Sequence, residues 1–575
     1  MPTAKQGQLP QDFRVSRSPG SLCDLHRQTS ARQGPRIAWR FRHWQRFRDL
    51  SYRATRRQAD RAAAGLITLG IQPGDRVGIL SENRIEWPIS DLAVLSTGAA
   101  DVTLHAPLSA EQVQFQLAHS ESRGVFVSGQ VQADKVFSQL DALPLLEFLV
   151  SFDPIELPAS LAPGRLNHLS WQGLCHRGAL AGLESEIAVR EENLHPESLA
   201  TLIYTSGTTG NPKGVMLTHG NLLSNVDSML PIADLRPTDT LLSWLPYSHV
   251  YARLTDNYLA TGAGITVALA GSMETLLSDL DAVKPSWMTA VPRFYEKLWT
   301  SVESLNPDKR TSQLQDIFGP RIRQLSSGGA PLPMHVCDGF SEAGLPIFEG
   351  YGLTETSPVI AFNHPAAFRF GSVGQAIPGV EVRIADDGEI LTRGPHVMRG
   401  YWKNQEATDE IICDGWFHTG DVGHLDDDGF LFITDRKKDL FVTSAGKNIA
   451  PGVLERIITT DPLFDQAVVY GDGRKFISAV VVPNLDQLAA DLPDTDWQEA
   501  STAGLLTSTT ILAHVQDRID TLMQAVSNPE RVKRCLVLSE PFQLANDELT
   551  ATLKVRRRHI IAKYESQLET FYQED

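Results

Sequence analysis

The chain has 575 residues, of which 42% are hydrophobic and 21% are charged. A chain of this length exceeds the usual size of one domain, so we expect a globular protein with at least two hydrophobic cores. Fifty-two Lys and Arg side chains against 69 Asp and Glu give a net charge of −17, which disfavours non-specific binding of nucleic acid. The five cysteines lie far apart without metal-binding spacing, and no apolar run reaches the ~20 residues of a membrane span. We therefore expect a cytoplasmic protein with reduced thiols.

The first 49 residues differ from the rest of the chain in charge. They carry ten Lys or Arg residues and three Asp residues. The favoured interpretation is a basic arm, residues 1–49, that is solvated and partly packs on the acidic body of the protein. A peripheral contact with an anionic membrane surface is the alternative, because such a surface attracts clustered Lys and Arg side chains.

Helical and strand patterns alternate from residue 52 onward. Residues 52–69 have the apolar spacing of an amphipathic helix, which ends at Gly70 and a turn, and residues 76–80 have the pattern of a buried strand. Further strand patterns occur at 124–128, 199–204, 264–268 and 346–348. This alternation predicts an α/β fold with two α/β layers and largely parallel sheets, in which ligands bind at the carboxyl ends of the strands.

From Gly371 the pattern changes to short strands and tight turns. Asp-Gly pairs at 387–388 and 428–429 each separate two strand-like segments, as in β-hairpins. Beyond a charged run come a hairpin with strands at 466–470 and 476–482, a helix at 511–525 and a basic helix near the C-terminus. We expect a β-rich subdomain at about 371–434 in a large N-terminal domain of residues 50–434. A hinge at 435–438 and a smaller, mobile α+β domain at 439–575 would follow.

The segment YTSGTTGNPKGVMLTH, residues 204–219, combines glycines and hydroxyl side chains with one lysine, Lys213. It lies between a strand-like and a helix-like segment, so we expect a strand-to-helix loop whose N–H and hydroxyl groups bind phosphate. A Walker P-loop is disfavoured, because Pro212 precedes the lysine and Gly214 follows it where that motif requires Gly-Lys-Ser/Thr. A flexible surface loop explains the alternation of glycine and hydroxyl residues poorly.

TSGTTGNPKG resembles the phosphate-loop signature of the adenylate-forming, or AMP-binding, superfamily, and further signatures of that superfamily occur in the same order. They are SYRATRRQADRAAAGLITLGIQPGDRV (51–77), SSGGAPLP (326–333), GYGLTET (350–356), GWFHTGDVGHLDDDGFLFITDR (415–436), KDLFVTSAGKNIAP (438–451) and ELTATLKVRR (548–557). The resemblance runs from about residue 50 to the C-terminus and is strongest for long-chain fatty-acyl-CoA synthetases.

The resemblance implies an AMP-forming acid–thiol ligase that works in two half-reactions. A carboxylate attacks the α-phosphorus of ATP to form an acyl-adenylate and pyrophosphate, and the thiol of CoA then expels AMP. It implies that Lys554 is the catalytic lysine of the first half-reaction, that Thr205 and Glu355 position Mg²⁺, and that His249 lies by the carboxylate. By composition alone, Lys554 would be one more cation of a basic helix, and His249 would be a structural histidine.

The nucleotide site that the resemblance implies draws residues from several motifs. Around the β- and γ-phosphates it places Thr205, Ser206, Gly207, Thr208, Thr209, Gly210 and Lys213. Around the adenine, the α-phosphate and the ribose it places Gly328, Gly329, Ala330, Glu349, Gly350, Tyr351, Gly352, Thr354, Asp421 and Arg436. In this arrangement Tyr351 stacks on adenine and Asp421 accepts from both ribose hydroxyls. The charges beside Arg436 would, by composition alone, form a solvated linker.

For the second half-reaction, the resemblance implies that the C-terminal domain swings about a hinge at Lys438. The segment brought toward CoA would contain Gly446, Lys447 and Asn448. Two residues near Lys554 depart from the usual pattern: Asp547 stands where related enzymes usually have glycine, and Ala551 where they usually have proline.

The implied substrates are a fatty acid, ATP with Mg²⁺, and CoA. Candidate walls of an acyl tunnel are Trp244, Val250, Tyr251, Tyr258 and Val359. Medium-chain or unusual acids stay open, because the segment 291–321 is shorter than in many long-chain members, and Ala252 and Arg253 replace an acidic-basic pair.

Two alternative functions stay open. A fatty acyl-AMP ligase would pass the acyl group to an acyl carrier protein, although no obvious extra insert between 379 and 435 would restrict domain rotation. A non-catalytic nucleotide-binding relative is the other, and the presence together of Lys213, Glu355, Asp421, Arg436 and Lys554 argues against it. The sequence makes no prediction of the oligomeric state.

Overall fold

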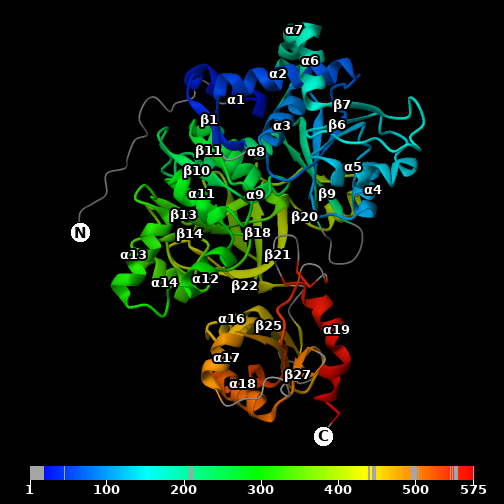
Figure 1. Ribbon diagram of the computed structural model, residues 1–575. Coiled ribbons are helices and arrows are strands. Elements are labelled where there is room, and N and C mark those ends of the chain that lie inside the picture. The colour runs from blue at the N-terminus through cyan, green and yellow to red at the C-terminus, as the bar shows by residue number, and fades with distance from the viewer. Residues whose placement is uncertain are drawn as a thin grey trace.

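The computed structural model describes residues 19–43, 46–205, 212–437, 441–442, 448–493, 501–502, 504–543, 546, 548–549 and 555–573 (Figure 1). Two wide mixed sheets and one small sheet form a large N-terminal part. A smaller α+β domain, coloured orange to red, lies at one end of the molecule. This arrangement confirms the predicted fold class. No helix among these residues is long and apolar enough to cross a membrane.

The first sheet has nine strands, and its central strands are parallel. Its order is β16 (Gln375–Ala376), β15 (Val359–Phe362), β14 (Ile347–Gly352), β13 (Gln324–Gly328), β12 (Trp287–Ala290), β10 (Thr240–Ser243), β11 (Thr266–Leu269), β1 (Ile37–His43) and β2 (Arg46–Ser51). The strands from β14 to β1 pair in parallel, whereas β15, β16 and β2 pair antiparallel at the two edges. The carboxyl ends of the central strands therefore meet along one edge.

The second sheet has eight strands. Its order is β19 (Gly400–Tyr401), β9 (Lys213–Thr218), β8 (Leu199–Thr205), β4 (Ala100–Leu104), β3 (Arg76–Leu80), β5 (Gly124–Val127), β6 (Phe148–Ser151) and β7 (Asn167–Ser170). The strands from β8 to β7 are parallel, and β9 and β19 are antiparallel additions. The central strands β3, β4 and β5 are almost wholly buried, as expected of a parallel sheet covered on both faces.

Helices connect the strands of both sheets. They are α1 (Leu22–Gln33), α2 (Tyr52–Thr68), α3 (Glu86–Ser96), α4 (Ala110–His119), α5 (Gln130–Phe137), α6 (Trp171–Ala181), α7 (Glu184–Glu192), α8 (His219–Met229), α9 (Val250–Ala252), α10 (Ala260–Ala263), α11 (Leu276–Val283), α12 (Pro292–Thr300), α13 (Pro307–Phe318), α14 (Met334–Glu342) and α15 (Gln405–Asp409). Local sequence sets several of their starts: the hydroxyl of Ser51 accepts from the backbone of Ala54 at the start of α2, and Ser109 and Gln112 form a capping box on α4.

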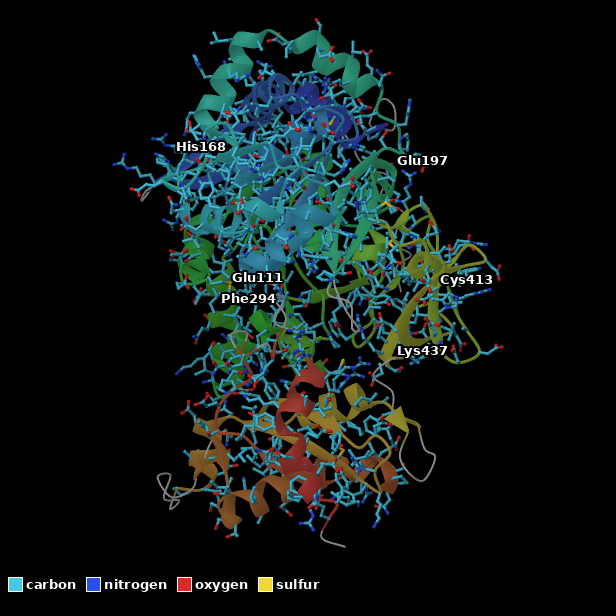
Figure 2. All side chains as sticks on the ribbon, turned by 90° about the vertical axis from the view of Figure 1, so that its right-hand side faces the viewer. Glu111, His168, Glu197, Phe294, Cys413 and Lys437 are labelled. Carbon is cyan, nitrogen blue, oxygen red and sulfur yellow. The ribbon has the colours of Figure 1, made fainter. Side chains whose placement is uncertain are left out.

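A five-stranded antiparallel sheet forms the β-rich subdomain. Its strands are β17 (Glu381–Ile384), β18 (Glu389–Arg393), β20 (Ile412–Cys413), β21 (Trp416–Leu425) and β22 (Leu431–Arg436). Both predicted hairpins are present. The predicted end at residue 434 is too early, because β22 continues through Arg436 and the backbone N–H of Lys437 donates to Gly420 at 2.8 Å. Figure 2 shows Lys437 at the end of this subdomain that faces the C-terminal domain.

The C-terminal domain packs helices around a three-stranded sheet. Its elements are α16 (Pro451–Ile458), β25 (Phe464–Tyr470), β26 (Ile477–Pro483), α17 (Leu485–Asp491), α18 (Thr509–Leu522), β29 (Val532–Val537) and α19 (Arg557–Thr570), with short pairs β23 (Phe441–Val442) and β24 (Asn448–Ile449), and β27 (Ser501–Thr502) and β28 (Leu505–Leu506). The predicted hairpin corresponds to β25 and β26.

Hydrogen bonds between described residues join this domain to the end of the β-rich subdomain. The carboxylate of Asp435 accepts a hydrogen bond from the backbone N–H of Gly452 at 2.8 Å, in the first turn of α16. The guanidinium of Arg456 donates to the carbonyl of Thr434, also at 2.8 Å. Of the predicted hinge residues, 435–437 are therefore held by β21 and α16. Lys438 lies outside the described residues.

The predicted basic arm, residues 1–49, is wrong for the part that the structure describes. Helix α1 buries Leu25, and strand β1 buries Trp39 and pairs with β11 as the second strand from one edge of the nine-stranded sheet. The arginines of this stretch find acidic partners: Arg27 pairs with Glu191, Arg40 with Asp49 at 2.8 Å, and Arg42 with Asp279 at 2.5 Å. Apolar burial and these pairs outweigh the solvation of a charged stretch. Lys5, Arg14 and Arg17 lie outside the described residues. For these three side chains, contact with an anionic membrane surface stays a prediction.

A buried ion cluster joins the two wide sheets. Arg253 begins a π-helical segment, η3 (Arg253–Leu259), between β10 and β11, and its side chain has no exposed surface. It pairs with Asp101 on β4 at 2.5 Å and with Asp91 on α3, and it donates to the hydroxyl of Thr201 on β8 at 2.7 Å. Residues of the nine-stranded unit and of the eight-stranded unit thus share one cation.

We expect Arg253→Met to lower the free energy of unfolding by about 3–5 kcal/mol, because it leaves two buried carboxylates without their cation. Chemical denaturation followed by circular dichroism measures this loss. Arg236→Met, at an arginine that is more than half exposed, is the control and should change stability by under about 1 kcal/mol. Equal effects of the two substitutions would contradict the structural role of the cluster.

Candidate active site

The glycine-rich segment joins two strands of the same sheet. Strand β8 ends at Thr205, β9 begins at Lys213, and the two residues are paired in the antiparallel register. The predicted strand-to-helix loop is therefore wrong, because Lys213–Thr218 forms a strand before α8 begins at His219. The β-forming run Val215, Met216 and Leu217 hydrogen-bonds to β8 instead of entering the helix. Ser206, Gly207, Thr208, Thr209 and Gly210 lie outside the described residues.

Lys213 and Glu355 meet at a common tyrosine. The ammonium group of Lys213 lies 4.9 Å from the centroid of the Tyr401 ring, and the Tyr401 hydroxyl donates to Oε1 of Glu355 at 2.8 Å. Burial first, and then the neighbouring carboxylate, raise the pKa of Tyr401, so the phenol stays protonated and can donate. Sequence reasoning missed Tyr401. Its signal is the pair Gly400-Tyr401, which forms strand β19 beside β9.

A tight turn at the end of β14 presents Thr354 and Glu355. The carbonyl of Glu355 accepts from the backbone N–H of Met398 at 2.8 Å, and the carbonyl of Pro358 accepts from Leu353 at 3.1 Å. A Cβ atom on Gly352 would lie 1.6 Å from that same carbonyl of Pro358, so only glycine fits the turn. Because Gly352 has no side chain, the backbone at Pro358 can pack directly against it after the turn that carries Glu355.

Asp421 is held at both of its oxygens. The Tyr351 hydroxyl donates to Oδ2 at 2.7 Å, and Nε of Arg436 lies 3.0 Å from Oδ1. The antiparallel pairing of β21 with β22 sets Asp421 directly opposite Arg436. Burial first, and then the charge of Asp421, raise the pKa of Tyr351 well above its usual range, so this phenol also donates. Asp421, Tyr351 and Arg436, predicted from two separate motifs, form one contact cluster.

The glycines predicted for the adenine lie at adjacent strand ends. Gly328 on β13 is paired with Gly350 on β14. A Cβ atom on Gly328 would lie 3.1 Å from the Tyr251 ring, and one on Gly350 would lie 3.1 Å from Phe362, so both positions are close to an aromatic side chain. Gly329 has φ of +88°, and Ala330 follows it after the strand end. This is the expected edge for a ligand in a parallel sheet.

Glu349 has a different setting from Glu355. The residue is 7% exposed, and its carboxylate accepts from the backbone N–H of Leu332 at 3.2 Å, with the thiol of Cys337 4.0 Å away. Burial raises the pKa of Glu349 to about 7. The structure thus places this carboxylate against the segment that follows β13, and its role in nucleotide binding stays a prediction.

His249 stands directly before α9. Its Nδ1 accepts from the backbone N–H of Tyr251 at 3.3 Å, which caps this short helix, and its ring lies 6.3 Å from that of His105. The helix continues into η3, whose first residue is the buried Arg253. This contact agrees with the structural interpretation of His249, and its place by the substrate carboxylate stays a prediction.

The C-terminal residues of the predicted site are less fully described. The backbone of Asn448 pairs with Val442 in the β23–β24 ladder. Lys554, Gly446 and Lys447, like Lys438, lie outside the described residues. No group of three or more His, Cys, Asp or Glu side chains suited to a metal occurs in the described ranges. A Mg²⁺ ion held by Thr205 and Glu355 would therefore take further oxygen ligands from the phosphates.

Comparisons with known proteins match both the N-terminal part and the C-terminal domain of the chain. The family model described as AMP-binding enzyme matches residues 26–402, and that described as AMP-binding enzyme C-terminal domain matches residues 438–575. The long-chain-fatty-acid–CoA ligase FadD15 of Mycobacterium bovis is 36% identical over 562 residues, covering 89% of this chain and 90% of the relative. Fatty acyl-CoA synthetase A of Dictyostelium discoideum is 30% identical over 581 residues, covering 91% and 86%.

Solved structures show the same fold. The adenylation domain of carboxylic acid reductase from Segniliparus rugosus, in complex with AMP and a carboxylic acid, superposes with a TM-score of 0.78 at 18% identity, covering 97% of this chain and 95% of that chain. The anthranilate CoA ligase AuaEII, in complex with anthranoyl-AMP, gives a TM-score of 0.76 at 20% identity, covering 96% and 99%. The match of both family models over most of its length shows that this chain belongs to the AMP-binding, or adenylate-forming, enzyme family.

Proposed function

We propose that the protein is an AMP-forming acid–thiol ligase that activates a long-chain fatty acid as its acyl-adenylate and transfers the acyl group to CoA. The observation that carries this proposal is the pair of carboxylates, Glu355 and Asp421, each held by a buried tyrosine hydroxyl near the carboxyl ends of β13 and β14. Two relatives at least 30% identical over most of the chain are named a long-chain-fatty-acid–CoA ligase and a fatty acyl-CoA synthetase, which supports the acid and the acceptor.

The first half-reaction needs neutralisation of phosphate charge and a fixed approach of the carboxylate. In our proposal Lys213 and the loop before it hold the β- and γ-phosphates, and Glu355 with Thr205 holds Mg²⁺. The ion would supply charge neutralisation on the phosphates. Tyr401 is a positioning residue that fixes the Glu355 carboxylate through a 2.8 Å hydrogen bond.

Asp421 and Arg436 bind the nucleotide in this proposal. With its oxygens oriented by Tyr351 and Arg436, the Asp421 carboxylate can also accept from ribose hydroxyls, since each oxygen has two lone pairs. Lys554 would then bridge the attacking carboxylate and the α-phosphate. Movement about Lys438 would later bring Gly446, Lys447 and Asn448 toward CoA.

For the acyl acceptor, CoA has one alternative, which is an acyl carrier protein. The five-stranded subdomain places short turns and one short helix, α15, between its strands, and shows no additional domain in the described residues 379–435. In our proposal the C-terminal domain rotates between the half-reactions, which favours CoA, whereas a carrier-protein ligase would restrict this rotation.

The substrate class can be measured directly. Acids from short to very long chain, with aryl and amino acids, are incubated with ATP, Mg²⁺ and either CoA or an acyl carrier protein, and pyrophosphate, AMP and thioester are scored. We expect the highest kcat/KM for long-chain fatty acids with CoA. Success of an aryl or amino acid together with failure of every fatty acid would refute the substrate, and thioester on the carrier alone would refute CoA.

Lys554→Ala should separate the two half-reactions. We expect acid-dependent pyrophosphate release to fall by about 10²–10³-fold, because an ammonium that stabilises the transition-state charge is lost. Thioester formation from supplied acyl-adenylate and CoA should stay within about twofold of wild type. Lys533→Ala, at an exposed lysine on β29 of the same domain, is the matched control. Equal loss of both half-reactions in Lys554→Ala would refute its assignment.

Tyr401→Phe should slow adenylate formation without unfolding the protein. We expect kcat for pyrophosphate release to fall about tenfold, since Glu355 loses the hydrogen bond that orients it. Raising Mg²⁺ should restore part of this loss. Tyr52→Phe removes a comparable buried hydroxyl, which donates to the carbonyl of Ile265 at 2.7 Å outside the candidate site, and serves as the control. A loss that is the same in both variants, or insensitive to Mg²⁺, would contradict the positioning role.

A further inference from the structure

A pocket of about 380 Å³ lies between α2, α6 and α7, outside the site described above. In both views these helices lie at the end of the molecule opposite the C-terminal domain (Figures 1 and 2). Because the nucleotide residues Asp421 and Arg436 belong to the subdomain that adjoins the C-terminal domain, this pocket is separate from the catalytic region.

The pocket has rigid walls, because helices α2 and α6 approach each other closely there. A Cβ atom on Gly178 would lie 1.8 Å from the backbone oxygen of Arg61, and one on Gly65 would lie 2.6 Å from that of Leu174. Close backbone approach of this kind leaves little freedom for the walls to collapse. The volume lies in the range of pockets that hold small molecules.

Four arginines of α2 line the pocket. Arg53, Arg57 and Arg61 recur every four residues and so form one stripe on the helix, about 12 Å long from first to last at 1.5 Å per residue. Like charges at this spacing repel one another. All three are exposed, and no ion pair holds any of them in the part of the chain that the structure describes.

The fourth arginine, Arg56, is 6% exposed and has neighbours of the opposite charge. It pairs with Asp60 at 2.5 Å and with Glu191, yet its Nη1 has no partner among the described residues. Two carboxylates line the pocket, Asp60 and Glu184, and Asp60 is already paired with Arg56. The wall therefore carries an excess of positive charge on a protein whose net charge is −17.

We propose that this pocket binds a small, soluble ligand with two or more phosphate groups, such as a nucleoside polyphosphate. Guanidinium groups bind phosphate oxygens in pairs, and a row of three suits several phosphates in line better than one. A membrane fits this face less well, because α7 presents exposed Glu184, Glu186 and Glu192 beside the pocket. A ligand in this pocket would not contact the reacting atoms. It would therefore act as a regulator and not as a substrate.

Inorganic tripolyphosphate is the probe, and its dissociation constant is measured by isothermal titration calorimetry on the full-length protein. The test variant is Arg57→Gln with Arg61→Gln, and the control is Arg46→Gln with Arg48→Gln. The control removes two exposed arginines of β2 that do not line the pocket. The two double variants have the same net charge, and any binding to the nucleotide site is common to both. Thermal unfolding without ligand checks that each variant is folded, and Arg57→Gln alone replaces the test variant if it is not.

We expect tripolyphosphate to bind the wild-type and control proteins with equal affinity, and to bind the test variant about tenfold or more weakly. Equal affinity in all three proteins, or no binding to the wild type, would overturn the proposal. Sedimentation with vesicles of phosphatidylcholine and phosphatidylglycerol is the second arm. Vesicle binding that needs Arg57 and Arg61, without any tripolyphosphate binding, would also overturn it, in favour of a membrane contact.

Discussion

The cation of Arg253 is the point on which the N-terminal part of the molecule depends. It lies where a segment of the nine-stranded unit crosses to Asp101 and Thr201 of the eight-stranded unit, and its carboxylate partners are fully buried. Desolvating such charges is costly, and a buried pair is stable only with close geometry and further hydrogen bonds. The network supplies these: the Tyr258 hydroxyl lies 3.1 Å from both oxygens of Asp91 and accepts from Nε of Arg253 at 2.8 Å. Since η3 continues α9, which begins directly after His249, the same cluster also fixes the chain beside the predicted carboxylate site.

The active-site region is organised by two carboxylate–tyrosine pairs. Glu355 and Asp421 come from different subdomains, and each accepts a hydrogen bond from a phenol that burial keeps protonated. A hydrogen bond from a phenol restricts the orientation of a carboxylate before a ligand binds. Preorganised polar groups lose little on binding, which is the condition for strong electrostatic catalysis.

Much of this architecture could be predicted from sequence, because its signals are local. Periodicity predicted α2 and β3 to within a residue, and the Asp-Gly turns predicted both hairpins of the β-rich subdomain. The motifs also named Asp421, Tyr351 and Arg436 without showing that they touch. Non-local pairing caused the errors: Lys213–Thr218 becomes a strand because β8 and β19 lie on either side of it, and residues 22–43 and 46–49 fold because β11 and Glu191 are available. Tyr401 was missed for the same reason, since its partners are 46 residues away or more along the chain.

The bond between Asp435 and Gly452 has a dynamic consequence. Asp435 lies near the end of β22, and its carboxylate accepts from the first turn of α16 in the C-terminal domain. One side chain therefore contacts both domains. Rotation of the C-terminal domain would exchange this cap for water, at a cost of about 1 kcal/mol, comparable with thermal energy. In the proposed rotation, this bond and the Arg456 contact would act as a latch that favours one orientation of the domains.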